Sequence, residues 1–175
     1  MIVDDLDGRI GEGWSGEVPN GSHVNVVLAR RGSPTAAAAI SMLAHPAPGH
    51  TPVLVCVGPT QAEYEPVWPP TLMMNKGTAL DDRHQTLTWG AAQLGIAQGV
   101  LDAVADGLLE TDGETIVLVA VWVDPGAHDE TAVRVANRAA TRKAIGVCVE
   151  GRDQDAARAL VERRDALQSP YYGGD

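Results

Sequence analysis

The sequence predicts an α+β fold, a two-layer α/β sandwich made by a single domain. Three observations support this prediction. The chain has 175 residues, which is enough to bury one hydrophobic core. Apolar segments of strand length alternate with longer segments of helical periodicity, a pattern typical of a sheet covered by helices. Finally, no internal repeat and no low-complexity linker divides the chain into smaller units.

The first quarter of the chain predicts two strands and a helix. Residues 1–22 are rich in Asp and Gly and show weak apolar alternation, which allows a first edge strand. Residues 23–29 are apolar and β-branched, as expected for a second strand. Ser33 suits an N-cap and Pro34 suits the first position of a helix, so we expect a helix over residues 35–44.

The middle of the chain predicts two further strands and a long helix. Residues 52–57 form an apolar run of strand length, and residues 71–78 form another. Between them, residues 59–70 contain four prolines, which indicates an ordered loop. Apolar residues recur at helical spacing over residues 82–106, and Gly107 is suited to end that helix.

The last third of the chain predicts one strand followed by two helices. Residues 116–123 have the strongest strand pattern in the sequence. Asp129 can cap a helix that continues to about Cys148. Gly151 should interrupt it, and residues 153–167 should form a last, strongly charged helix.

The charge balance excludes two classes of partner. The chain has 13 Lys and Arg against 23 Asp and Glu, a net charge of −10. Without a basic stripe we expect no nucleic-acid binding, and an acidic protein binds anionic membranes poorly. There is no signal-peptide pattern and no apolar run of membrane-spanning length, so we expect a cytoplasmic protein.

Common motifs for metals, nucleotides and acyl transfer are missing from the sequence. It contains no dinucleotide or phosphate-binding glycine loop and no nucleophile elbow. No histidine pairs with another histidine or a cysteine at the close spacing typical of zinc sites, so we expect no metal. The histidines are His23, His45, His50, His84 and His128.

Four polar residues in otherwise apolar segments are candidates for a site. His23 and Asn25 are two positions apart on a predicted strand, so both point to one face. Lys76 interrupts an apolar strand, and Gln93 lies on a helix face. Three of the four also have a structural interpretation: His23 as a satisfied strand histidine, Lys76 as an edge-strand lysine with its amine in water, and Gln93 as a partly exposed helix glutamine.

Four blocks that contain these residues resemble the formaldehyde-activating enzyme family. They occur in unbroken order over roughly residues 10–151, and the spacing between them also fits the family. The blocks are the strand from His23 with Arg31-Gly32-Ser33-Pro34, the strand at 51–57, the segment 71–78 with Asp81-x-Arg83, and Gly90-x-Ala92-Gln93-x-Gly95 with Asp102-Ala103-Val104. We therefore interpret residues 1–151 as a formaldehyde-activating-enzyme-like domain and residues 152–175 as a C-terminal helix and tail.

The resemblance implies a reaction and an assembly. It implies a lyase that condenses formaldehyde with a reduced pterin, tetrahydromethanopterin, to give the methylene derivative in one-carbon metabolism and formaldehyde detoxification. Tetrahydromethanopterin is then a cosubstrate, with no tightly bound cofactor and no metal, and the protein is a homopentamer. The family's general acid falls on His23, and its substrate-binding positions fall on the residues Asn25, Leu54, Lys76, Thr78 and Gln93.

Two departures from the family pattern leave alternatives open. Asn25 stands where the family has Asp, and Leu94 stands where it commonly has His. An amide carries no charge, so the polar environment of His23 differs from that in the family. The alternatives are a paralogue that uses tetrahydrofolate or another amine as carrier, and a non-catalytic protein that binds a pterin or an aldehyde.

Overall fold

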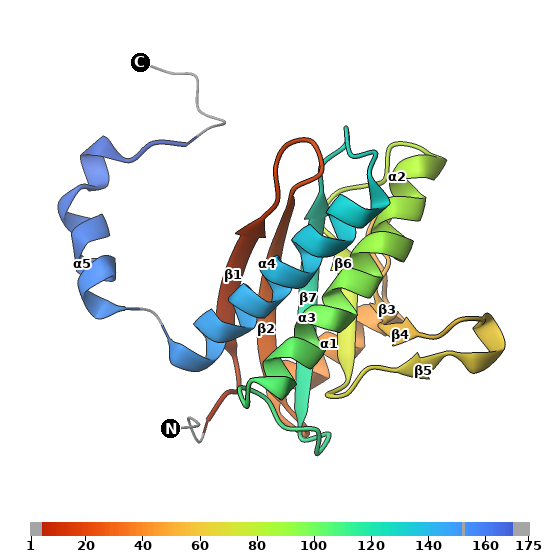
Figure 1. Ribbon diagram of the computed structural model, residues 1–175. Helices are drawn as coiled ribbons and strands as arrows, with labels where there is room; N and C mark the ends of the chain where they lie inside the picture. The colour runs from red at the N-terminus through yellow and green to blue at the C-terminus, as the bar shows by residue number, and fades with distance from the viewer. Residues whose placement is uncertain (1–4, 152, 170–175) are drawn as a thin grey trace.

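The centre of the computed structural model, which describes residues 5–151 and 153–169, is a five-stranded mixed sheet (Figure 1). Its strand order is β1-β2-β7-β6-β3, and β6 and β7 are the parallel pair. The bounds are β1 (Arg9–Ser15), β2 (Ser22–Arg30), β3 (Val53–Leu54), β6 (Thr71–Asn75) and β7 (Thr115–Val123). The sheet and its helices confirm the predicted α+β class.

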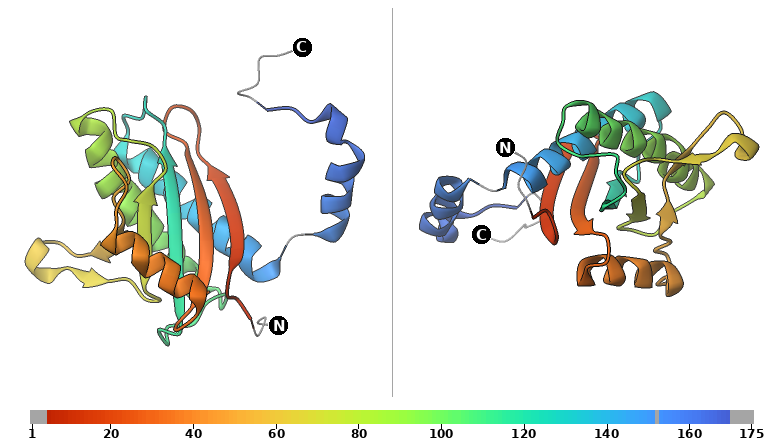
Figure 2. Two further views of the ribbon diagram at one scale, coloured as in Figure 1. Left: turned by 180° about the vertical axis from the view of Figure 1, so that it is seen from behind. Right: turned by 90° about the horizontal axis from the view of Figure 1, so that it is seen from below.

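Helices lie on both faces of the sheet, but they cover the faces unequally. α3 (Gln93–Ala105) and α4 (Glu130–Glu150) lie side by side on one face, preceded by α2 (Asp82–Thr86) and a π-helical segment, η2 (Leu87–Ala92). On the opposite face α1 (Pro34–Ala44) lies toward one end (Figure 2). The sheet face beyond α1 is therefore available for a site.

The core lies between the sheet and the α3–α4 layer. Both β2 and β7 alternate buried and half-buried residues, since successive side chains of a strand point to opposite faces. Their inward side chains are almost fully buried in this core. They pack against apolar residues of α3 and α4 that include Ile96, Val100, Ala140 and Ala144. The predicted caps are confirmed: Ser33 Oγ accepts from Ala36 N, and Asp129 accepts from Ala132 N.

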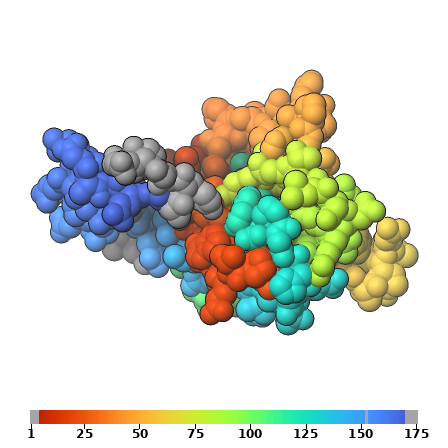
Figure 3. Space-filling view, turned by 90° about the horizontal axis from the view of Figure 1, so that it is seen from above, coloured from red at the N-terminus to blue at the C-terminus, as the bar shows by residue number. Residues whose placement is uncertain are grey.

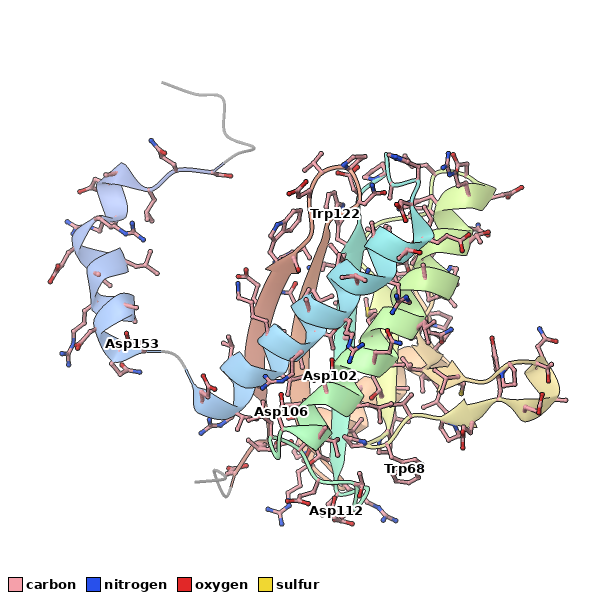
Figure 4. The ribbon with its side chains drawn as sticks, in the orientation of Figure 1. Trp68, Asp102, Asp106, Asp112, Trp122 and Asp153 are labelled. Carbon is pink, nitrogen blue, oxygen red and sulfur yellow. The ribbon has the colours of Figure 1, made fainter. Side chains whose placement is uncertain are left out.

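Glycines allow α3 and α4 to pack closely. A Cβ atom at Gly95 would lie 2.3 Å from the Arg134 carbonyl oxygen, and one at Gly99 would lie 2.5 Å from that of Arg138. Along the outer side of this contact, Arg138 makes two hydrogen bonds of 2.5 and 2.6 Å to Asp102, a residue that Figure 4 labels on α3. The hydrogen bond from Arg138 is the main reason why the pKa of Asp102 is lowered.

The prediction of a loop at residues 59–70 was wrong in part. The prediction of one continuous strand at residues 52–57 was also wrong in part. The chain leaves the main sheet after β3 and forms a hairpin arm from β4 (Cys56–Val57), the 3₁₀ turn η1 (Gln61–Glu63) and β5 (Glu65–Pro66). The buried Val55 joins the two sheets, because its N–H donates to the Thr71 carbonyl and its own carbonyl accepts from Val67 N. Short strands in a proline-rich segment leave little signal in sequence periodicity.

Three other boundaries differ from the predictions. β6 ends at Asn75, so residues 76–78 lie in the following loop. The predicted helix over 82–106 is continuous in space but contains the π-helical segment η2. The last helix is shorter than predicted, with α5 (Gln154–Glu162) followed by a 3₁₀ turn, η3 (Arg164–Ala166), and it projects away from the sheet.

The turn between β1 and β2 is tied to the loop that follows β7. Asn20 Oδ1 accepts hydrogen bonds from the backbone N–H groups of His128 (2.9 Å) and Asp129 (3.0 Å), and Arg83 donates to the His128 carbonyl. Figure 3, seen from above, shows this turn (red) beside the loop (cyan) and α2 (yellow-green). The end of the sheet where β2 begins is thereby held by three chain segments.

Candidate active site

His23 and Asn25 lie on the sheet face opposite α3 and α4. The residues of β2 that alternate with them are buried in the core, whereas both of these side chains are half-buried. On the neighbouring strand β7, Trp122 is paired with His23 and Ala120 with Asn25, so these four residues share one face. This confirms that the two polar residues of β2 share a face, as their spacing predicted.

Lys76 reaches the same place from the other side of β7. Its backbone N–H donates to the Val121 carbonyl (2.7 Å), which extends the parallel ladder by one residue beyond β6. Its Nζ donates to Asn25 Oδ1 at 2.6 Å and lies 2.8 Å from His23 Nδ1. Neighbouring strands are about 4.8 Å apart, so the lysine side chain has to extend across β7 to reach β2.

The position of the Lys76 amine changes its acidity. Burial lowers its pKa from 10.5 to about 8, and the charge of Glu12 acts weakly in the opposite direction. The lowering follows because burial disfavours the charged form of an amine. With this pKa, about a tenth of the Lys76 side chains is neutral at pH 7, a far larger fraction than for a lysine with the ordinary pKa.

His23 lies between an amine and a carboxylate. Because Nδ1 faces the donating amine of Lys76, we infer that the proton of the neutral ring is on Nε2. Nε2 lies 3.5 Å from Glu12 Oε1. The three side chains thus form a row in which a proton can pass between Lys76 and the imidazole.

Two tryptophans border His23. The ring centroid of Trp14 lies 6.5 Å from that of His23 and 6.1 Å from that of Trp122. Trp14 is 40% exposed, and Trp122 lies near the end of β7 in Figure 4. Aromatic surfaces of this kind can contact a flat heterocycle.

Sequence reasoning did not single out Glu12, Trp14 or Trp122. Glu12 pairs with Asn25 and Trp14 pairs with His23 in the β1–β2 hairpin. The signal that could have found them is the alternation along β1 combined with a turn over residues 16–21. A hairpin drawn from those two features would have placed Glu12 beside Asn25.

A buried polar network fixes the start of β2. The Ser22 hydroxyl lies 2.8 Å from Asn137 Oδ1 and 3.0 Å from the Trp122 carbonyl. Asn137 on α4 is fully buried, and its amide donates to the Val133 carbonyl. These bonds link β2 and α4 directly next to His23.

A second network shapes the chain on both sides of Lys76. The buried Asn75 amide donates to the carbonyls of Gly49 (2.8 Å) and Gly77 (2.6 Å), and its oxygen accepts from Thr51 N (3.3 Å). The end of β6 is therefore held against the loop that precedes β3, which orients Lys76 over the sheet.

Leu54 and Thr78 make none of the hydrogen bonds of the polar cluster, and Leu54 is separated from β2 by the strands β6 and β7. Leu54 pairs with Leu72, so it is on the same face as His23, and it is 43% exposed. Thr78 is exposed in the loop after β6 and packs against Gly49, where a Cβ atom would lie 2.3 Å from the threonine hydroxyl. A cavity of about 200 Å³ separates α1 from the sheet beside Asn25, lined mainly by apolar residues.

Gln93 is on the other side of the sheet. It lines a cavity of about 370 Å³ between the start of α3, the start of α4 and the β4–β5 arm. Its amide N–H donates to the Trp89 carbonyl, one turn earlier in the same helical segment. The cavity is also lined by Cys56, Tyr64, Trp89, Glu130 and Arg134.

The structure therefore brings together three of the six predicted site residues: His23, Asn25 and Lys76. Among the residues that the structure describes, no three His, Cys, Asp or Glu side chains form a group that could hold a metal ion. No helix in the described ranges is both long and apolar enough to span a membrane.

Comparisons with known proteins agree with the earlier resemblance. The chain is 32% identical over 173 residues to a 5,6,7,8-tetrahydromethanopterin hydro-lyase of Methanosarcina barkeri, which covers 98% of this chain and 94% of the relative. It is 32% identical over 142 residues to a bifunctional enzyme Fae/Hps of Archaeoglobus fulgidus, covering 80% of this chain and 35% of that protein. A similar enzyme of Methanothrix thermoacetophila is 30% identical, covering 94% of this chain and 41% of the relative.

The chain thus spans well under half the length of the bifunctional relatives, but nearly all of the single-function one. The family model described as formaldehyde-activating enzyme matches residues 10–172, which include every residue of the polar cluster. This chain therefore belongs to the formaldehyde-activating enzyme family.

Proposed function

We propose that this protein is a lyase that condenses formaldehyde with tetrahydromethanopterin to the methylene derivative and water. The observation that carries this proposal is the match to the formaldehyde-activating enzyme family over residues 10–172. The Methanosarcina barkeri relative is named for the same cosubstrate. The reaction would serve one-carbon metabolism and formaldehyde detoxification, in the cytoplasm and without a resident metal or cofactor.

In the proposed mechanism, His23 is the general acid. One pterin nitrogen adds to formaldehyde and gives a carbinolamine, which must lose its hydroxyl group before the second nitrogen closes the methylene bridge. Hydroxide is a poor leaving group, and imidazole can supply the proton near neutral pH. Contacts with Lys76 and Glu12 support this role, because they hold both ring nitrogens of His23.

The other predicted site residues would bind the pterin. Asn25, Lys76, Thr78 and the backbone near Leu54 would contact it on the open sheet face, and the side chains of Trp14 and Trp122 would border it. Gln93 lies in the cavity on the helical side, so it would reach the same pterin only from a second subunit. This is the reason for proposing a site shared between the subunits of a homopentamer.

The decisive assay compares the rate of methylene-pterin formation with and without the protein. We expect acceleration with tetrahydromethanopterin, because positioning of the two reactants can contribute several kcal/mol, at most about 7–11. Acceleration only with tetrahydrofolate or another amine would assign a different carrier. Binding of a pterin without acceleration would make the protein a non-catalytic binder.

Replacing Gln93 by alanine is predicted to raise KM for the pterin about threefold to tenfold, because one hydrogen bond of about 0.5–1.5 kcal/mol is lost. The measurement is initial-rate kinetics at varied pterin concentration. Gln85→Ala is the matched control, since Gln85 is exposed on α2 and does not line the cavity of Gln93. Equal KM values for the two variants would remove Gln93 from the site.

The homopentamer is predicted to have five times the 18.4 kDa mass of one chain. A closed ring of identical interfaces would give a single species at micromolar concentration. Light scattering coupled to size exclusion measures this mass directly. A monomeric protein that condenses at full rate would contradict the shared site.

A further inference from the structure

We propose that the Lys76 amine captures formaldehyde covalently and hands the carbon to the acceptor amine. The capture step stands on the geometry of the cluster alone, whereas the transfer step rests on the proposed function. Lys76 would then be a catalytic residue and more than a contact for the pterin.

The hydrogen bonds of Nζ fit a neutral amine. A neutral amine has two N–H bonds and one lone pair, and Nζ has two neighbours within hydrogen-bond distance, Asn25 Oδ1 and His23 Nδ1. If both N–H bonds point to these atoms, the lone pair is left for an electrophile. Both neighbours are uncharged in this arrangement, and no carboxylate in the described part of the chain forms an ion pair with Lys76.

The acidity of the amine supports the same role. With a pKa of about 8, Lys76 supplies a nucleophilic fraction near neutral pH that a lysine with an ordinary pKa does not. The sheet also restricts the position of the amine, because Lys76 starts from a backbone hydrogen bond to β7 and ends against β2.

The capture step balances without a further reagent. The Nζ lone pair forms a bond to the formaldehyde carbon, and the electrons of the carbonyl π bond move to oxygen. His23 Nδ1, 2.8 Å away, takes a proton from the nitrogen and delivers it to the oxygen, which gives Lys–NH–CH₂OH. His23 then takes up one proton from solvent and gives it to the hydroxyl, so that water departs and the iminium Lys–NH⁺=CH₂ remains.

The transfer step regenerates the lysine. An acceptor amine adds to the iminium carbon and gives an aminal, which expels Lys76 as its neutral amine once a proton has moved between the two nitrogens. The carbon is then an iminium on the acceptor, where a second nitrogen can close the bridge. The proton released on closure returns through His23 to solvent, and the net change is loss of one water.

The composition of the chain makes the capture step easy to test. The protein has two lysines, Lys76 and Lys143, and Lys143 is exposed on α4. The full-length protein is treated briefly with isotopically labelled formaldehyde and cyanoborohydride near pH 7, and peptide mapping by mass spectrometry locates the methyl groups. The N-terminal amine also reacts with formaldehyde, but its label is on a separate peptide and is therefore not confused with that of either lysine.

We expect methylation of Lys76 to be at least about tenfold faster than that of Lys143, with a rate that rises as the pH passes through about 8. Asn25→Asp should lower the labelling of Lys76 about tenfold, because a carboxylate against Nζ stabilises the ammonium form. Lys143→Arg is the matched control and should leave the labelling of Lys76 unchanged. Equal labelling of the two lysines in the unmodified protein would overturn the proposal.

The condensation assay on Lys76→Arg separates this proposal from the proposed function. Arginine keeps a cation and its donors but is not nucleophilic, so the rate should fall at least about 100-fold if the lysine carries the carbon. Full activity of Lys76→Arg would refute the covalent route while leaving the proposed function intact. Selective labelling of Lys76 without any acceleration of condensation would support capture and refute the proposed function.

Discussion

Replacement of His23 by alanine is expected to lower the protein-dependent rate of condensation by about 100-fold or more. A positioned general acid typically contributes a factor of about 10²–10⁴, and in this cluster the imidazole is the group that touches both the Lys76 amine and the Glu12 carboxylate. The loss should fall mainly on kcat, because the proton is needed after the reactants have bound. Stopped-flow measurement of methylene-pterin formation, with the uncatalysed rate subtracted, gives the result.

The control for this variant is His45→Ala. His45 is exposed at the end of α1 and is outside the polar cluster, so its loss should leave the rate unchanged. The side chain of His23 is 35% exposed, so the alanine variant should also keep its melting temperature within a few degrees. A normal rate in a normally folded His23→Ala protein would show that another group supplies the proton.

Replacement of Gly95 by alanine is expected to destabilise the fold by about 3 kcal/mol, which is roughly 10 °C in melting temperature for a chain of this size. The added methyl would lie 2.3 Å from the Arg134 carbonyl oxygen and 2.8 Å from the Asn137 Cβ atom. The closest atom belongs to the backbone of α4, so rotation of a side chain cannot relieve the contact and α3 has to move away from α4.

Gly90→Ala, in the preceding π-helical segment, is the matched control. Apart from its chain neighbours and the backbone of its own helical segment, a Cβ atom there meets no atom within 4 Å, and alanine favours helical conformation over glycine by about 1 kcal/mol. The melting temperature, measured by thermal unfolding followed by circular dichroism, should therefore fall for Gly95→Ala and rise for Gly90→Ala. A Gly95→Ala protein as stable as the unmodified one would mean that α3 and α4 tolerate a wider spacing.

The elements of the fold were largely predictable because each depends on local sequence. The apolar runs of β2 and β7, the Ser33 and Asp129 caps and the break at Gly151 all lie where the sequence indicates. The β4–β5 arm was not predictable from periodicity. Its strands have two residues each, and they depend on the bend at Val55 between two sheets.

The candidate site was predictable only within single strands. Spacing alone puts His23 and Asn25 on one face, but it does not give the order of the strands. Lys76 meets them because β7 lies between β6 and β2, and that order joins segments about fifty residues apart. Glu12 was missed for a related reason, since its position depends on the register of a hairpin. The position of Gln93 on the opposite side of the sheet was not predictable either, because it depends on which face of the sheet α3 covers.

The strands that carry the polar cluster separate two kinds of mutational effect. The inward residues of β2 and β7 are buried in the core, and the outward ones, His23, Asn25 and Ala120 among them, face the open side. A substitution at an outward position can therefore alter chemistry at little cost in folding, whereas its neighbour one residue away has the opposite effect. Such a sheet face can acquire a new amine or aldehyde specificity through single substitutions, because folding stability depends on the inward residues and reactivity on the outward residues of the same strands.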